Sequence, residues 1–195
     1  MTAFDPRTSF DEALETLQAF LADPDCLGGV RQFAASAEET LRKGGLLMSC
    51  GNGGSMCDAM HFAEEWTGRF RGNRKAQAAI AFSDPSHLTC NANDFGYEQV
   101  FAREVEAYGK PGDLLLALST SGNSPNVLRA CETARSMGVK TVGLLGKDGG
   151  ELKSLVDIPI IVPRAETSDR IQELHIKIIH IVIETVERSL FPENY

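Results

Sequence analysis

Short hydrophobic runs alternate along the chain with longer stretches whose hydrophobic positions recur at helical spacing. The short runs predict five strands over residues 46–50, 78–82, 114–119, 140–146 and 158–162. The longer stretches predict helices over residues 10–21, 30–43, 56–69, 98–108, 125–137 and 168–190, with a short helical turn near residue 151. Because the strands lack strict polar alternation, both faces of their sheet should be covered. The pattern predicts an α/β fold, a doubly wound five-stranded parallel sheet flanked by helices.

Two segments fall outside this alternation. Residues 24–29 contain proline and glycine and predict a break between the first two helices, and residues 83–96 are polar and have no predicted regular structure. No linker or repeat separates independent units, so we expect one domain over residues 1–195. Its parts would be a helical extension (1–43), an α/β core (44–166) and a carboxy-terminal helix (167–195).

The last predicted helix is hydrophobic over much of its circumference. Its apolar positions are Ile171, Leu174, Ile176, Ile178, Ile179, Ile181, Val182, Ile183 and Val186. A helix with so little polar surface is usually buried on several sides, and a monomer of this size offers few places for it. We therefore expect a homo-oligomer.

Composition and charge narrow the possible partners. The 195 residues include 43% hydrophobic and 24% charged residues, as in ordinary globular chains. The formal net charge is −8 and the 19 lysines and arginines are scattered, which argues against nucleic acid or an anionic membrane as the main partner. A small anionic ligand stays possible, because backbone amides and hydroxyls can bind a phosphate locally.

The cellular location is predicted from what the sequence lacks. The amino terminus has no signal-peptide pattern, and no apolar run approaches the length of a membrane span. Five cysteines, an odd number without a C-x-x-C pair, indicate neither a disulfide framework nor a cysteine zinc site. We expect a protein of the cytoplasm.

A glycine-rich loop follows the first strand and opens a helix. It reads Gly51-Asn52-Gly53-Gly54-Ser55, and free amides at a helix start can receive an anion. It is not a Walker A loop, and Met56 stands where a dinucleotide-binding loop would have its third glycine. By itself the loop is equally consistent with a tight turn that has no ligand.

A second polar loop follows the third strand. It carries four hydroxyls, on Ser119, Thr120, Ser121 and Ser124, and precedes Pro125, a favoured first residue of a helix. Capping of the helix would use one of these hydroxyls but not four. Because α/β folds bind ligands at the carboxyl ends of their strands, the two loops together predict a phosphate site.

Polar residues on two helices form the other candidate group. His61 and Glu65 are four apart and share a helix face, as a zinc pair or, more often, an exposed charge pair would. Gln172 and His180 are separated by about 12 Å along their helix and about 80° around it, which strains a shared ion unless they reach toward it from opposite ends or belong to different subunits. His175 competes as a ligand, or is a core histidine bonded to a backbone carbonyl.

These segments resemble a known family. The stretches CGNGGSMCDAMHFAEEWTGRF, NANDFGY, LSTSGNS, GKDGG and DRIQELHIKIIH are similar to the phosphoheptose isomerases of the sugar isomerase (SIS) domain superfamily, and the resemblance covers nearly the whole chain. It implies a flavodoxin-like SIS fold and the conversion of D-sedoheptulose 7-phosphate to D-glycero-D-manno-heptose 7-phosphate. It also implies a place in heptose synthesis for lipopolysaccharide or other surface glycans.

The resemblance also implies site residues. Around the sugar phosphate it places Asn52, Gly53, Gly54, Ser55, Ser119, Thr120, Ser121 and Ser124. Asn93 and Asp94 would meet substrate hydroxyls, and Arg69 and Asp169 are further polar candidates for substrate binding. One zinc ion per subunit of a homotetramer would be held by His61, Glu65, Gln172 and His180, of which Glu65 and Gln172 would also contact substrate.

The implied chemistry needs few groups. Moving a proton between adjacent carbons through an enediol or enediolate requires a base at carbon, a proton relay at oxygen and stabilisation of developing charge. Glu65 is the expected base and His180 the expected acid, each contributing about 10²- to 10⁴-fold. Zinc would add polarisation of the substrate oxygens.

Two other functions compete with an isomerase. The first is a non-catalytic SIS protein that binds a partner, like the relatives associated with the replication initiator, and the second is a domain that senses sugar phosphates. The presence of both Glu65 and His180 favours the enzyme over the partner-binding protein. The absence of an attached DNA-binding segment counts against the sensor.

Overall fold

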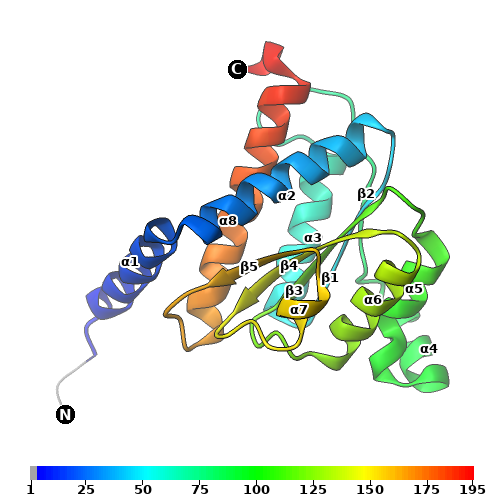
Figure 1. Cartoon of the computed structure of the whole chain (residues 1–195), viewed down its shortest axis with the longest axis horizontal. Coiled ribbons are helices and arrows are strands. Elements are labelled where there is room, and N and C mark those ends of the chain that lie inside the picture. Colours follow the sequence, from blue (N-terminus) through cyan, green and yellow to red (C-terminus); the bar gives the residue numbers. More distant parts are fainter. Residues whose placement is uncertain (1–3) are drawn as a thin grey trace.

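The computed structural model describes residues 4–195 and has a central parallel sheet with helices on both faces (Figure 1). Within these residues the sheet has five strands in the order β2-β1-β3-β4-β5, and all neighbouring strands are parallel. The strands are β1 (Leu47–Gly51), β2 (Ala79–Ala81), β3 (Leu114–Ser119), β4 (Lys140–Gly146) and β5 (Ile158–Val162). The predicted doubly wound five-stranded sheet is confirmed.

Helices connect and flank these strands. They are α1 (Arg7–Ala22), α2 (Pro24–Arg42), α3 (Gly54–Thr67), α4 (Pro85–Phe95), α5 (Val100–Tyr108), α6 (Pro125–Ser136), α7 (Leu152–Leu155) and α8 (Ser168–Leu190), with short 3₁₀ helices η1 (Tyr97–Gln99) and η2 (Pro192–Asn194). The long carboxy-terminal helix lies where the hydrophobic pattern predicts it. None of the helices in the described part of the chain is long and apolar enough to cross a membrane.

The predicted break over residues 24–29 is wrong. Helix α2 begins at Pro24, directly after the cap residue Asp23, whose side chain accepts a hydrogen bond from the Asp25 amide. Proline is accepted at this first position because its missing N–H would have no helical partner there. Gly29 lies inside the helix, where a Cβ would come within 2.9 Å of Ile160 Cγ1, so the glycine allows α2 to approach β5 closely.

The polar segment over residues 83–96 is also more regular than predicted. Most of it forms α4, which Asp84 caps by accepting a hydrogen bond from the His87 amide. Asn91 is the one buried residue of this helix. Because α4 buries so little surface, it needs few hydrophobic residues at helical spacing, and the sequence pattern that would predict it is weak.

The sheet separates two hydrophobic layers. On one face α2, α3 and α8 pack against side chains such as Leu116 and Leu144, and on the other α5, α6 and α7 pack against Leu115 and Leu145. Successive strand residues thus point to opposite faces and are buried on both, which explains the unbroken hydrophobic runs of the sequence.

Helix α8 finds its burial within a single chain. Of its apolar side chains, Ile171, Ile178, Ile179, Val182, Ile183 and Val186 are at most 2% exposed, since α8 packs against α2, α3 and the sheet. The premise that a monomer cannot cover this helix is wrong. Ile181 alone among its large apolar residues is strongly exposed, at 46%.

The strand order reverses direction between β1 and β3, in the interior of the sheet. From β1 the chain crosses to β2 on one side, whereas β3, β4 and β5 follow on the other side. At such a reversal the loops that leave the two neighbouring strands diverge, and ligands of doubly wound folds bind between them. The loops in question are those that follow β1 and β3.

Candidate active site

The loop after β1 requires glycine at its turn. Gly53 has φ +56° and ψ −123°, a conformation that L side chains rarely adopt, and α3 starts at the next residue. A Cβ on Gly51 would come within 2.9 Å of Ser55, so this residue must also be small. The loop therefore places the amides of a helix start at the carboxyl end of β1, where they favour an anion.

An amide pair joins this loop to the start of α6. Asn52 Nδ2 donates to Asn126 Oδ1 at 2.9 Å, and Asn126 Nδ2 donates in return to Asn52 Oδ1 at 2.8 Å. The hydroxyl of Tyr97 also donates to Asn52 Oδ1, at 3.0 Å. Asn126 is only 1% exposed, so the pair fixes the first loop relative to the element that follows the second.

The loop after β3 gathers its hydroxyls. Ser119 Oγ lies 3.0 Å from Ser124 Oγ and 3.5 Å from Ser121 Oγ. Gly122 has φ +67° and packs so closely on the Gly149 carbonyl that no side chain fits. Grouped hydroxyls at the start of a helix can donate to several oxygens of one phosphate group without a lysine.

The first turns of α8 lie beside both loops. Ser168 Oγ lies 3.2 Å from Thr120 Oγ1 of the second loop. The Gln172 amide lies against the first loop, since a Cβ built on Gly54 would come within 2.6 Å of Gln172 Oε1. The two loops and the amino-terminal part of α8 thus form one polar group of side chains.

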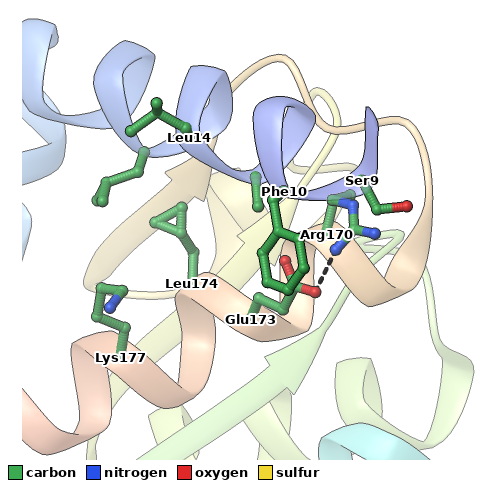
Figure 2. Close-up of a pocket in the computed structure, with 9 residues that line it drawn as sticks. Ser9, Phe10, Leu14, Arg170, Glu173, Leu174 and Lys177 are labelled. Carbon is green, nitrogen blue, oxygen red and sulfur yellow. Dashed lines mark hydrogen bonds and ion pairs between the residues drawn. The ribbon is translucent and has the colours of Figure 1, made fainter. Parts of the chain in front are cut away.

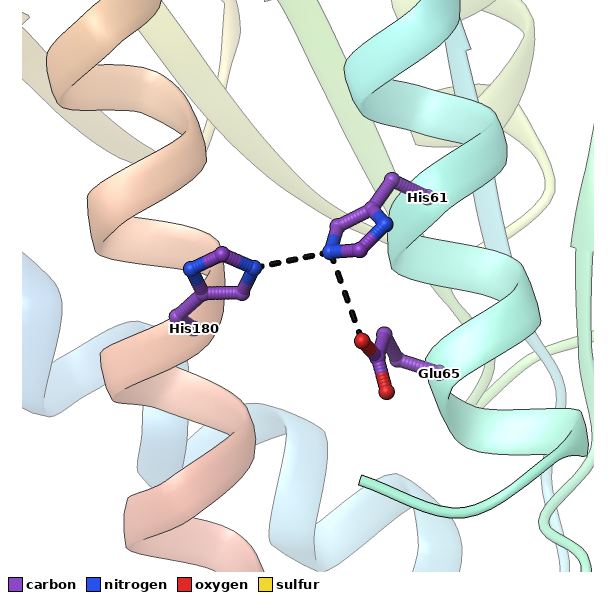
Figure 3. A group of neighbouring side chains, drawn as sticks. All are labelled: His61, Glu65 and His180. Atoms are coloured by element: carbon purple, nitrogen blue, oxygen red, sulfur yellow. Dashed lines mark hydrogen bonds and ion pairs between the residues drawn. The ribbon is translucent and has the colours of Figure 1, made fainter. Parts of the chain in front are cut away.

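A second group lies farther along α3 and α8 (Figure 3). His61 and Glu65 extend from α3 toward His180 of α8, and one ligand atom from each lies within 4.8 Å of the others. The Nε2 atoms of His61 and His180 are 2.7 Å apart, and Glu65 Oε1 is 3.4 Å from His61 Nε2. The predicted pair of His61 and Glu65 is therefore joined by the imidazole of His180, which is 119 residues after His61 in the sequence.

The electrostatics of this group suit proton transfer. Partial burial, reinforced by the charge of Glu64, raises the pKa of Glu65 above its usual value. Partial burial and the neighbouring His61 and Lys177 lower the pKa of His180. The carboxylate is thereby a stronger base, and the imidazole is neutral near pH 7 and able to exchange a proton.

The donor set also fits a metal ion. Glu64 Oε1 lies 3.1 Å from His61 Nδ1, an arrangement that leaves the Nε2 lone pair of His61 directed at the cluster. Two imidazole nitrogens and a carboxylate oxygen are ligands that zinc accepts. Gln172, the fourth predicted ligand, lies beside Gly54, two helical turns before His180 on α8.

Of the two interpretations of His175, a metal ligand or a core histidine, the structure supports the core histidine. Its ring is fully buried, and Nε2 lies 3.1 Å from the Leu145 carbonyl oxygen, to which it can donate. Burial lowers its pKa to about 4. The ring is therefore neutral and structural.

The other predicted residues are exposed and form no hydrogen bond or ion pair with either group within residues 4–195. Asp169 is exposed at the start of α8 beside Ser168, and a hydrogen bond from Thr167 lowers its pKa. Asn93 and Asp94 are exposed at the end of α4, where Asn93 donates to Asp94 at 2.8 Å. Arg69 is exposed just after α3. The side chains of Arg69, Asn93 and Asp94 have no contact with the loops or the histidines among the described hydrogen bonds and ion pairs.

Three polar residues at the site escape prediction from the sequence. Asn126 and Ser168 each stand at a helix start, where an ordinary capping role explains them equally well. Tyr97 belongs to the NANDFGY segment, yet only the folded chain brings its hydroxyl to Asn52. In the sequence these three residues are marked only by being polar and by lying in or beside segments already named from the sequence.

The fold and the two loops are those of an SIS domain. A family model described as "SIS domain" matches residues 10–146, which is most of the chain. A phosphoheptose isomerase from Fusobacterium nucleatum is 52% identical over 188 residues, covering 96% of this chain and 96% of the relative. The chain belongs to the phosphoheptose isomerase family and is an enzyme of that family.

Solved structures agree with this assignment. A phosphoheptose isomerase from Francisella tularensis superposes with a TM-score of 0.90 at 32% identity, covering 96% of this chain and 100% of that one. A phosphoheptose isomerase from Neisseria gonorrhoeae gives a TM-score of 0.86 at 35% identity, covering 93% and 96%. The similarity therefore extends over the sheet, the flanking helices and α8.

Proposed function

We propose that the protein converts D-sedoheptulose 7-phosphate to D-glycero-D-manno-heptose 7-phosphate through an enediol or enediolate. The observation that carries the proposal is the pair of groups along α3, a glycine-rich loop at its start and, farther along the same helix, His61 and Glu65. His61 is seven positions after Gly54, or about 10 Å along an ideal helix. That separation is comparable with the length of an extended seven-carbon monoester, whose phosphate and reacting carbons lie at opposite ends.

The two loops would bind the phosphate and orient the opened sugar. Their amides and the hydroxyls of Ser55, Ser119, Ser121 and Ser124 can surround the phosphate oxygens. Held by its phosphate, the substrate would lie along α3 with C1 and C2 near the histidine cluster. Asn93, Asp94, Arg69, Asp169 and Gln172 are proposed contacts for its hydroxyls.

Glu65 and His180 would then carry the proton transfers. Glu65 takes the proton from the carbon beside the carbonyl and returns it to the adjacent carbon, while His180 moves the proton between the two oxygens. The raised pKa of Glu65 strengthens it as a base. Without a bound metal, burial and the neighbouring His61 and Lys177 lower the pKa of His180, which makes its protonated ring a stronger acid.

We propose one zinc ion per chain, held by His61, Glu65 and His180 with Gln172 as the fourth ligand. Convergence of the two Nε2 atoms and the carboxylate supports this. A carboxylate bound tightly to zinc is a weaker base, so the contact of Glu65 with the ion would loosen when substrate binds. When bound, the ion would polarise the oxygens of the reacting carbons. Gln172 and His180 are eight residues apart on one helix, so they would have to reach toward a shared ion from opposite ends.

A homotetramer is part of the proposal, and α1 supplies its support. This helix projects from one end of the molecule (Figure 1), and Phe10, Leu14 and Leu21 on it are 77%, 52% and 54% exposed. Phe10 and Leu14 also line a groove of about 440 Å³ between α1 and Leu174 of α8 (Figure 2). Analytical ultracentrifugation should give four chains, and a monomer would contradict this part.

Three further parts of the proposal concern the chain as a whole. We propose that residues 1–195 act as one SIS domain, with the helical extension, the α/β core and the carboxy-terminal helix as its parts. Five unpaired cysteines support a location in the reducing cytoplasm. Heptose synthesis for lipopolysaccharide or surface glycans is the proposed pathway, supported by the family membership.

The test is turnover by the purified, zinc-supplied protein. Incubation with sedoheptulose 7-phosphate should give an aldoheptose 7-phosphate, and Glu65→Gln and His180→Gln should each abolish it with the fold retained. Glu106→Gln, which alters an exposed ion pair on α5, is the control and should keep wild-type activity. Absence of product from the wild type would favour the partner-binding function instead.

A further inference from the structure

A fully buried ion pair lies near the histidine cluster and takes no part in the proposed chemistry. Arg74, in the segment after α3, donates through Nε to Glu187 of α8, and both side chains are 0% exposed. Removing two opposite charges from water is costly unless their remaining hydrogen bonds are satisfied. The role of the pair therefore depends on what else the arginine and the carboxylate contact.

The rest of the guanidinium is occupied by the end of α3. Nη2 donates to the carbonyl of Glu65 at 2.6 Å, and Nη1 donates to the carbonyls of Trp66 at 2.8 Å and Gly68 at 3.2 Å. The last carbonyls of a helix have no partner within the helix, and a cation there also complements the helix dipole. Arg74 thus caps α3 at the very residue whose side chain is the proposed base.

The partner carboxylate is fixed from the other side. Tyr195 donates its hydroxyl to Glu187 Oε2 at 3.1 Å, so both oxygens of Glu187 are bonded. The chain end packs closely on the segment after α3, because a Cβ on Gly72 would come within 2.6 Å of Asn194. The pair is closed off from water by the carboxy-terminal residues.

The geometry connects this pair to the site. Glu187 is seven residues after His180 on α8, two helical turns away and on the same face. Arg74 therefore joins α3 at Glu65 to the face of α8 that carries His180. Without this contact the carboxy-terminal end of α3 and its neighbour α8 lose their only fully buried ionic link within residues 4–195.

We propose that Arg74 is a positioning residue of the active site, which with Glu187 and Tyr195 sets the separation between Glu65 and His180. The proposal rests on the isomerase function proposed above. Lysine in place of Arg74 can pair with Glu187 but cannot bond the α3 carbonyls at the same time, because it lacks the planar fork. Arg74→Lys should therefore keep the charge and release the end of α3.

The test compares Arg74→Lys with Arg71→Lys. Arg71 also joins the segment after α3 to α8, through a two-pronged pair with Glu184, but that pair is partly exposed and touches no α3 carbonyl. A displacement near 1 Å can cost about 10²-fold in rate. We expect Arg74→Lys to lower kcat about 10- to 100-fold with KM within about threefold, and Arg71→Lys to stay within about twofold of wild type in both.

A purely structural role predicts a different result. In that case Arg74→Lys would lower the melting temperature but leave kcat unchanged at a temperature where the variant is folded, and that outcome overturns the proposal. Tyr195→Phe removes one hydrogen bond at a partly exposed residue, so it tests the same link with little risk to folding. A smaller fall in kcat at constant KM is expected for it.

Wild-type turnover separates the two claims. An inactive wild type contradicts the proposed function, and the positioning claim is then judged from a crystal structure of Arg74→Lys. That structure should show the Glu65 carboxylate displaced from His180 relative to the wild type. A carboxylate in its original place would overturn the positioning role whatever the reaction is.

Discussion

Replacing Asn126 tests whether the two loops act as one binding site. Asn126→Leu preserves the size of a 1% exposed side chain but removes both hydrogen bonds to Asn52. The hydrogen bond that the Val127 amide donates to Asn126 Oδ1, at 3.1 Å, is lost as well. The hydroxyl of Tyr97 still reaches Asn52, so the first loop keeps one of its side-chain contacts.

The expected magnitude follows from those bonds. Each intramolecular hydrogen bond contributes about 0.5–1.5 kcal/mol net, and Asn52 is exposed enough for water to replace part of the loss. We expect the free energy of unfolding to fall by about 1–3 kcal/mol. If ordering the loop then costs about 1.4 kcal/mol on binding, KM rises about tenfold. The kcat should change little, since Asn126 lies at the loops and not at the histidine cluster.

Steady-state kinetics measures KM and kcat, and urea denaturation measures the free energy of unfolding. Asn126→Asp is the companion variant, because it can still accept from Asn52 but puts a negative charge beside the phosphate loops. Its KM should rise further than that of Asn126→Leu, and added salt should reduce the difference by screening. Unchanged KM and unchanged unfolding free energy in Asn126→Leu would refute the coupling of the loops.

Three other perturbations have expected outcomes. The His175 side chain is protonated near pH 6.5 in the unfolded chain but only near pH 4 in the folded one. As pH falls from 7 to 4, the free energy of unfolding of the wild type should therefore fall by about 3 kcal/mol relative to that of His175→Gln, measured by denaturation at each pH. Gly122→Ala meets the Gly149 carbonyl at 2.0 Å and should destabilise far more than Gly44→Ala, which has open space and costs only the left-handed backbone penalty of about 1–2 kcal/mol. Equal melting temperatures for the two would contradict this geometry. Chelation should abolish turnover and lower the melting temperature, with both restored by zinc; a chelator-treated, metal-free protein with full activity would exclude the ion.

Local sequence features were enough to predict the framework. The hydrophobic runs predict the strands because each strand is buried on both faces, and Gly53 and Pro125 mark how each loop passes into its helix. The pair His61 and Glu65 shares a helix face through its spacing alone. Loop, strand and helix-face features all depend on residues close together in the sequence.

Long-range contacts were not predictable in the same way. The bonded residues Asn52 and Asn126 are 74 positions apart, and Arg74 and Glu187 are 113 apart. An asparagine after a proline and an arginine in a loop both have ordinary surface roles, so nothing local marks them as buried. The burial of α8 within one chain was missed for the same reason, because the surfaces that cover this helix, on α2 and α3, come from distant parts of the chain. The oligomer itself stays a prediction.

A crystal structure of the Glu65→Gln variant with sedoheptulose 7-phosphate tests the central claim most directly. We predict the phosphate within hydrogen-bonding distance of Ser55, Ser119, Ser121 and Ser124, and C1 and C2 of the opened sugar between Gln at position 65 and the His180 ring. A phosphate bound outside both loops, or reacting carbons far from these two side chains, would contradict it.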